Sequence, residues 1–473
     1  MCESVNMLQD AVQPQVLAGH RAGRARTLTW LTYLFIFAIC FAAWIPFAIE
    51  IAGLNLRLSQ MLLPVVLLRL WIQRPVRTIR RASVALLGLG GVFWLALLFW
   101  TAVNLADLPS AVGALGRVFL LGLNLLHLVT VYLLARRTGR WQGATLSLLA
   151  SVTVLNSILL GVTVGARLGL SGLQRLLSEE GAPILLEGEL ISGTVSRFKF
   201  AGLNSGVISA AALVIVIALL LQPGRRRLRW LWLVGAVAAI GMVLGFSRQN
   251  VVSLAGGLAV VGLYLVLQGR LTRLIKLALL MVVIVVVGLV ALFRLPGGQE
   301  FYAAFAGRAL LLFRPEAYST GTVSARTAIW SGMWRDIQHN PLTGLGQDAY
   351  LRHILNPNES GSHNYPLEVL HSSGLIGFLA YLGMHVLIGY WAWRALFWHW
   401  VSEDDRALLL GLIGAYVALW LSSFTNLIFS TPVYWAVIGL VLAGVQRLRE
   451  RPKPLSRQVP AVGRHSEESL GSS

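Results

Sequence analysis

Long apolar stretches, separated by short polar segments, make up most of the chain. Many of these stretches reach the roughly 20 residues that an α-helix needs to cross the hydrocarbon core of a bilayer. The pattern predicts an all-α polytopic membrane protein with about 12 membrane-spanning helices. The predicted spans are 28–48, 55–73, 83–104, 114–135, 143–165, 203–221, 229–246, 249–268, 274–295, 373–397, 407–424 and 430–446.

Two longer segments interrupt the spans, at 166–202 and 296–372. The second mixes apolar, aromatic and polar positions at near-helical spacing, which predicts short amphipathic helices over the outer mouth of the bundle. We therefore expect one transmembrane domain over 28–446 with two outer loops. A cytosolic segment, 1–27, would precede it, and a disordered cytosolic tail rich in Pro, Ser and Arg, 447–473, would follow. The first apolar stretch is long enough to remain as a span, so we expect no cleavable signal.

Composition and charge agree with a membrane protein and predict its orientation. Hydrophobic residues make up 56% of the 473 positions, charged residues make up 12%, and the mean hydropathy is +0.70, which excludes an ordinary soluble domain. The net charge of +19 comes largely from basic residues gathered in alternate loops. This is the positive-inside pattern rather than a nucleic-acid surface, and it places both termini in the cytosol. The basic clusters are Arg74, Arg77, Arg80 and Arg81; Arg136, Arg137 and Arg140; Arg225, Arg226, Arg227 and Arg229; Arg270, Arg273 and Lys276; and Arg447, Arg449 and Arg451.

Several classes of chemistry find no support in the sequence. The two cysteines, Cys2 and Cys40, offer no disulfide and no metal cluster. No G-x-x-x-x-G-K-[ST] phosphate loop is present, which argues against ATP-driven work. We interpret His353 and His371 as structural, because their spacing is not that of zinc ligands. We therefore expect no metal and no cofactor.

The polar stretch 362–368, just before a membrane-length apolar stretch, contains a candidate catalytic base. His363 is able to take a proton near neutral pH. Pro366 favours the first turn of the next helix and Asn364 can cap it, so His363 is expected beside a helix N-terminus. The positive end of that helix would keep the imidazole neutral and basic, and Glu368 is placed to orient the ring. A loop histidine without a role is the alternative.

Two arginines are candidate ligands for a phosphate ester. The polar tetrad 247–250 interrupts an apolar stretch long enough for two spans, which predicts a tight turn at the outer membrane surface. Arg248 would be costly there unless it snorkels or meets an anion. Arg326 lies on a predicted helix of the large outer loop. Arginine forks match phosphate oxygens, but a snorkelling arginine at the first position and a solvated one at the second are the alternatives.

The chain resembles the superfamily of O-antigen ligases and O-antigen polymerases, and it is closest to the ligase pattern. That pattern is H-[NSQ]-x9-G-x-x-G, and the segment 326–346 looks like the preceding part of the same domain. The resemblance covers the region of about 200–400 directly. The residues that match the pattern are His363, Asn364, Gly374 and Gly377.

The resemblance implies a glycosyltransferase of the bacterial inner membrane that works at the periplasmic face without ATP or metal. It would move a glycan from undecaprenyl diphosphate to an acceptor hydroxyl, which in ligases is on lipid A–core. His363 would be the base, and Arg248 and Arg326 would hold the diphosphate, with Arg197 as a possible further ligand. A single displacement would invert the anomeric carbon.

Two other functions remain open. A polymerase would use the same donor and fold, but its acceptor would be another lipid-linked repeat. A transporter of lipid-linked glycans belongs to a different class, and it would need charged residues deep within several spans. Most charges in this chain lie at the ends of the predicted spans, which favours an enzyme.

Overall fold

The computed structural model describes most of the predicted transmembrane domain. Most of the predicted cytosolic segment 1–27 and large parts of both outer loops lie outside the described residues. The same holds for the predicted disordered tail 447–473 from 451 onward, whereas 447–450 are helical and correct that prediction. The described residues are 27–39, 48–51, 54–72, 81–167, 187–192, 195–199, 205–221, 229–244, 248–294, 322–354, 361–425, 429 and 431–450.

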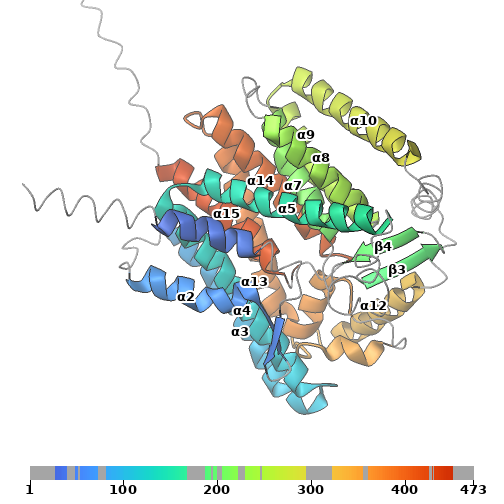
Figure 1. The fold of residues 1–473 in the computed structure, drawn as a ribbon. Coiled ribbons are helices and arrows are strands. Elements are labelled where there is room, and N and C mark those ends of the chain that lie inside the picture. Colours follow the sequence, from blue (N-terminus) through green and yellow to red (C-terminus); the bar gives the residue numbers. More distant parts are fainter. Residues whose placement is uncertain are drawn as a thin grey trace, which may run out of the picture.

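The structure is dominated by helices, and each apolar stretch predicted as a span coincides with a helix within these ranges (Figure 1). A helix satisfies the backbone hydrogen bonds of an apolar segment internally, which is why such stretches become helical. The helices are Thr27–Ile39, α2 Leu58–Ile72, α3 Arg81–Val103, α4 Ala111–Thr138, α5 Trp141–Arg167, α7 Ser205–Leu220, α8 Arg229–Leu244, α9 Arg248–Leu267, α10 Leu271–Arg294, α13 Tyr365–Leu396, α14 Glu403–Ser422 and α15 Pro432–Glu450.

Five helices of the described part are long and apolar enough to cross a membrane: α3, α4, α9, α13 and α14. Four shorter apolar helices accompany them, namely the first helix, α2, α7 and α8. Many large apolar side chains on the outside of the bundle are exposed, as lipid-facing side chains would be. The protein is therefore a helical membrane protein, and the twelve-span topology with its sidedness stays a prediction.

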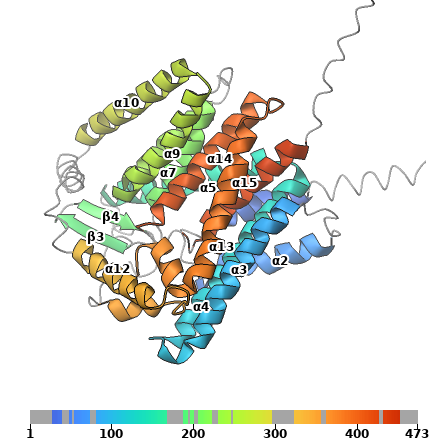
Figure 2. The same ribbon diagram turned by 180° about the vertical axis from the view of Figure 1, so that it is seen from behind.

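Helix α7 lies at the centre of the bundle and α10 at its edge (Figures 1 and 2). Nearly every residue of α7 is buried, and the helix packs against α8, α9 and α14. Helix α10, in contrast, exposes a series of apolar residues on one side. Elsewhere α3 packs along α13, and α4 packs along α15. The exposed residues of α10 are Leu271, Ile275, Leu279, Val282, Val283 and Val286.

Hydrogen bonds at both ends fix α9 antiparallel to α14. At the start of α9, the side-chain amide of Gln249 donates to the Ser422 carbonyl at 2.7 Å, at the end of α14. Just after α9, Arg270 forms a forked ion pair with Glu403, the first residue of α14, at 2.5 and 2.7 Å. One end of the bundle thus carries the basic cluster around Arg270, and the opposite end carries the N-terminus of α9.

Two short antiparallel hairpins accompany the helices. β1, Ala48–Ile51, pairs with β2, Leu54–Arg57, directly before α2. β3, Glu187–Ser192, pairs with β4, Val195–Lys199, in the predicted outer loop 166–202. The second hairpin lies beside α12 in both views (Figures 1 and 2).

The described part of the segment 296–372 contains an amphipathic helix, α12, Thr322–His339. Ile329 and Met333 on one side of α12 are buried against Tyr350 of the short 3-10 helix η4, Ala349–His353, whereas Trp334 is 51% exposed. A helix of this kind is what the aromatic and apolar spacing predicts. That it lies on the periplasmic side stays a prediction.

Helix α13 is kinked at Gly374, where the backbone takes the non-helical angles φ 66° and ψ −174°. The kink frees the carbonyl groups of the preceding turn from helical hydrogen bonds. The backbone amide of Leu345 donates to the carbonyl of His371 at 2.9 Å, and Gly346 N donates to that of Ser372 at 3.0 Å. The glycine-rich turn after α12 is thereby docked onto α13. A Cβ on Gly374 would lie 2.5 Å from the carbonyl oxygen of Leu342, so the close approach requires glycine.

The Gly374→Ala substitution should lower the free energy of unfolding by about 2 kcal/mol or more, because this positive-φ, extended backbone is essentially restricted to glycine and costs other residues about 1–3 kcal/mol, and the Cβ also clashes. Thermal unfolding of the detergent-purified protein measures the loss. Gly389→Ala on the same helix is the matched control, since a Cβ there meets nothing within 4 Å. Equal unfolding temperatures for wild type and the Gly374 variant would contradict this account of the kink.

Candidate functional site

His363 lies two residues before α13, half-buried, with its backbone in the left-handed region at φ 52°. This conformation is uncommon for a residue other than glycine and costs roughly 1–3 kcal/mol unless its surroundings enforce it. The neighbouring side chains do so. Asn364 caps α13 by accepting a hydrogen bond from the Leu367 amide at 3.2 Å, and Pro366 occupies the first turn. Both of these local predictions are confirmed, and they place His363 beside a helix N-terminus.

Glu368 holds the loop that carries His363. Its buried carboxylate accepts a hydrogen bond from Ser362 Oγ and another from Gln347 Nε2, the latter at 2.9 Å. The sequence predicts that Glu368 orients the imidazole ring. In the structure Glu368 accepts a hydrogen bond from Ser362, the residue before His363. It therefore holds the backbone next to His363.

The turn that carries Gln347 is tied to α3 and α4. The backbone amide of Gln347 donates to Oγ1 of Thr101 at 2.9 Å, and Thr101 lies near the end of α3. Arg117 of α4 donates to Asp348 Oδ1 at 2.9 Å and to the Tyr350 hydroxyl at 2.8 Å. Burial raises the pKa of the Asp348 carboxyl, and the neighbouring Arg117 and Gln347 offset only part of that rise. A continuous polar network therefore runs from α4 to the His363 loop.

Helix α12 brings Arg326 toward the same loop. Trp330 of α12 donates from Nε1 to the carbonyl oxygen of Ser362 at 2.7 Å. Arg326 lies four residues earlier on α12 and is half-buried, so it shares the helix face of Trp330. This face is directed toward the residue that precedes His363. The structure thus brings Arg326 and His363 to one region.

The N-terminus of α9 reaches the same end of the bundle. Gln249 contacts Ser422 through both the carbonyl and the hydroxyl oxygen, at 2.7 and 2.9 Å. The backbone amide of Tyr365 donates to the carbonyl of Ser423 at 2.9 Å. Two consecutive residues at the end of α14 therefore anchor the start of α9 and the start of α13. Arg248 is the first residue of α9, four positions after the last residue of α8. The predicted tight turn at 247–250 is therefore corrected for 248–250, which form the first turn of α9, while 247 lies outside the described residues.

Three predictions about these side chains stay untested. The side chain of Arg248 lies outside the described residues, although its backbone position is given. The same holds for Arg197, which lies in β4 opposite Glu189 of β3. For Asn364, the structure gives the capping role and tests no further one.

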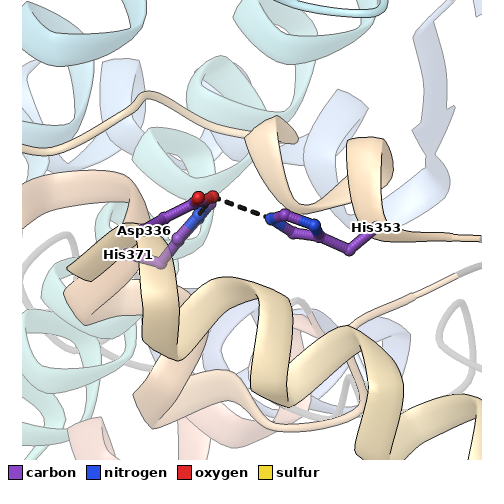
Figure 3. A group of neighbouring side chains, drawn as sticks. All are labelled: Asp336, His353 and His371. Carbon is purple, nitrogen blue, oxygen red and sulfur yellow. Dashed lines mark hydrogen bonds and ion pairs between the residues drawn. The ribbon is translucent and has the colours of Figure 1, made fainter. Parts of the chain in front are cut away.

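Asp336, His353 and His371 form a cluster that the sequence did not reveal (Figure 3). His353 Nε2 lies 2.7 Å and His371 Nε2 lies 2.9 Å from the same oxygen, Asp336 Oδ2. Burial alone would raise the pKa of the Asp336 carboxyl, but the hydrogen bonds from His371 and His353 outweigh it and lower that pKa. The carboxylate is therefore ionised near neutral pH. Asp336 precedes the two histidines by 17 and 35 residues, a separation that contains no recognisable motif.

A comparison with known protein families finds a match in the region of the chain that contains the candidate site. The family model described as O-antigen ligase matches residues 233–382. The match includes α9, α10, α12 and η4, together with the first half of α13. No curated protein sequence matches the chain. Residues 233–382 are thus similar to the O-antigen ligase family, and this matched segment contains Arg248, Arg326 and His363.

Proposed function

We propose that the protein is a glycosyltransferase that moves a glycan from undecaprenyl diphosphate to an acceptor hydroxyl at the periplasmic face of the inner membrane. Ligation of O-antigen to lipid A–core is the proposed reaction. The observation that carries the proposal is that His363, the Arg326 face of α12 and the first turn of α9 meet at one end of the bundle, within the family domain.

The proposed orientation follows from the charge pattern. The basic cluster around Arg270 lies at the opposite end of α9 from Arg248. Basic loops face the cytosol in most membrane proteins, so the end with His363 would face the periplasm. Both termini would then be cytosolic, as the sequence predicts.

His363 would act as the general base. The helix N-terminus beside it disfavours the imidazolium ion, so the ring stays neutral and able to accept the proton of the acceptor hydroxyl. Trp330 and Glu368 hold the Ser362 carbonyl and hydroxyl, and through them the strained backbone of His363. A fixed position of the imidazole would lower the entropic cost of reaching the reactive geometry.

Arg326 and Arg248 would stabilise the diphosphate as it leaves. The acceptor oxygen bonds to the anomeric carbon while the bond from that carbon to the diphosphate oxygen breaks, and the hydroxyl proton passes to His363. Negative charge grows on the diphosphate, and guanidinium groups neutralise it by charge-assisted hydrogen bonds. Arg197 is a further candidate ligand. This single displacement inverts the anomeric carbon, and isolation of a covalent glycosyl-enzyme would contradict it.

His363→Ala should lower the rate of glycan transfer by about 10²–10⁴, the usual range for loss of a general base. The assay uses purified enzyme, purified lipid-linked donor and a lipid acceptor. His339→Ala is the matched control, because His339 is exposed at the end of α12 and bonds only locally to the Arg335 carbonyl among its recorded contacts. An unchanged rate for the His363 variant, with its unfolding temperature retained, would remove the base assignment.

Arg326→Ala should lower kcat by about 10²–10³, because one charge-assisted interaction with the leaving group is lost. Arg326→Lys keeps the charge without the planar fork and should recover part of that loss. Arg394→Ala is the control, since Arg394 is exposed at the far end of α13. A change in KM alone would assign Arg326 to ground-state binding instead of the chemical step.

The acceptor decides between ligation and polymerisation. A spacing of the form R-x10-G, which resembles a motif of one polymerase subgroup, runs from Arg335 to Gly346, so polymerisation is the second candidate. We expect product when lipid A–core is supplied with the donor, and none when a second lipid-linked repeat is the sole acceptor. The opposite result would identify a polymerase. A transporter would form no transfer product with either acceptor.

A further inference from the structure

We propose that Asp336, His353 and His371 bind a divalent transition-metal ion, with Zn²⁺ as the ion that the ligand set fits. The site goes beyond the proposed function, since no step of glycan transfer uses it. Three elements supply one ligand atom each: α12, η4 and α13. The three atoms, one carboxylate oxygen and two imidazole nitrogens, lie within 4.8 Å of one another (Figure 3).

The donor set matches zinc chemistry. Two imidazole nitrogens and one carboxylate oxygen are the three protein ligands of many zinc sites that keep a fourth position open. The side chain of His371 is fully buried, whereas those of His353 and Asp336 are 24% and 29% exposed. The buried histidine gives a fixed ligand, and the exposed side of the cluster leaves access for a water molecule as the fourth ligand.

The local backbone is arranged to let His353 reach the carboxylate. Gly332 lies one turn before Asp336 on α12, and a Cβ there would be 2.5 Å from the Cγ and Nδ1 atoms of the His353 ring. The ring therefore lies directly against the α12 backbone. Any larger residue at position 332 would displace the imidazole from Asp336.

Metal binding needs a small movement and an exchange of protons. The 2.7 and 2.9 Å separations are those of hydrogen bonds, while ligand atoms around a tetrahedral zinc ion with bonds of about 2.0–2.1 Å lie about 3.3 Å apart. The partly exposed Asp336 and His353 side chains can shift so that these two separations widen by about half an ångström. The two imidazole nitrogens, which lie up to 4.8 Å apart, would also have to move closer together. Each neutral imidazole would ligate through Nε2 as the tautomer that carries its proton on Nδ1, so the proton now on Nε2 would move to Nδ1 by exchange with water. Among the described residues, Nδ1 of His371 has no hydrogen-bond partner, so moving a proton onto it breaks no existing bond.

A bound ion would cross-link α12 and η4 to α13. His371 is two turns beyond His363 along the chain, and Trp330 of α12 contacts Ser362. An ion held by Asp336 and His371 would therefore fix the helix of Arg326 relative to His363. Its effect would be on stability, because a ligand that binds the folded state alone raises the unfolding temperature.

The test uses the full-length protein, purified in detergent and stripped with a chelator, and then titrated with zinc chloride. We expect about one ion per chain and a rise in unfolding temperature of a few degrees at saturation. Asp336→Asn and His353→Gln should each weaken binding at least about tenfold. His339→Gln, an exposed histidine three residues from Asp336, should bind as the wild type does.

The His339→Gln control distinguishes zinc binding at the cluster from zinc binding to an exposed surface histidine. Wild-type protein that binds no zinc would overturn the proposal, and so would equal binding by the wild type and both cluster variants. The three residues would then serve as a hydrogen-bonded tie between helices. Since the titration contains no glycan, its outcome is independent of whether the protein transfers one. The unfolding temperature without metal shows that each variant is folded.

Discussion

The buried carboxylate of Glu368 is the group around which the candidate site is assembled. A buried carboxyl group is costly unless hydrogen bonds surround it, and Ser362 and Gln347 supply them from two different segments. Gln347 is in turn held by Thr101 at the end of α3. Loss of either partner would leave the buried carboxyl group with an unmade hydrogen bond, so the segments are held together. The unusual backbone of His363 persists because both its neighbour and the following helix cap are fixed.

The helices and the local features of the site could be predicted from the sequence, because each depends on neighbouring residues. Apolar stretches of membrane length become helices, and Asn364 followed by Pro366 begins one. Contacts between distant segments could not be predicted. Glu368 and Gln347 are separated by 21 residues, and nothing in the spacing of Asp336 and the two histidines indicates that they converge. The sequence pattern includes Gly374. The reason that a glycine is required there, a kink onto which the Leu345–Gly346 turn docks, is evident only from the fold.

The end of α14 relates the two predicted halves of the site. Ser422 and Ser423 are adjacent in the chain, and one anchors the start of α9 while the other anchors the start of α13. The predicted diphosphate ligand Arg248 and the predicted base His363 therefore share one support. The distance between leaving group and base can therefore stay fixed without direct contact between Arg248 and His363, because both helices are bonded to the same end of α14.

The kink at Gly374 separates the part of α13 that holds the site from the part that runs through the apolar bundle. Helices adjust their tilt when the thickness of the surrounding hydrocarbon changes. The segment after the kink packs along α3, where Gly377 lies against Ala96 and Gly383 against Leu89. The segment before the kink is bonded to the turn that carries Leu345 and Gly346. A change in lipid chain length would then tilt the segment after Gly374, while the segment before it, which carries the candidate site, would keep its position.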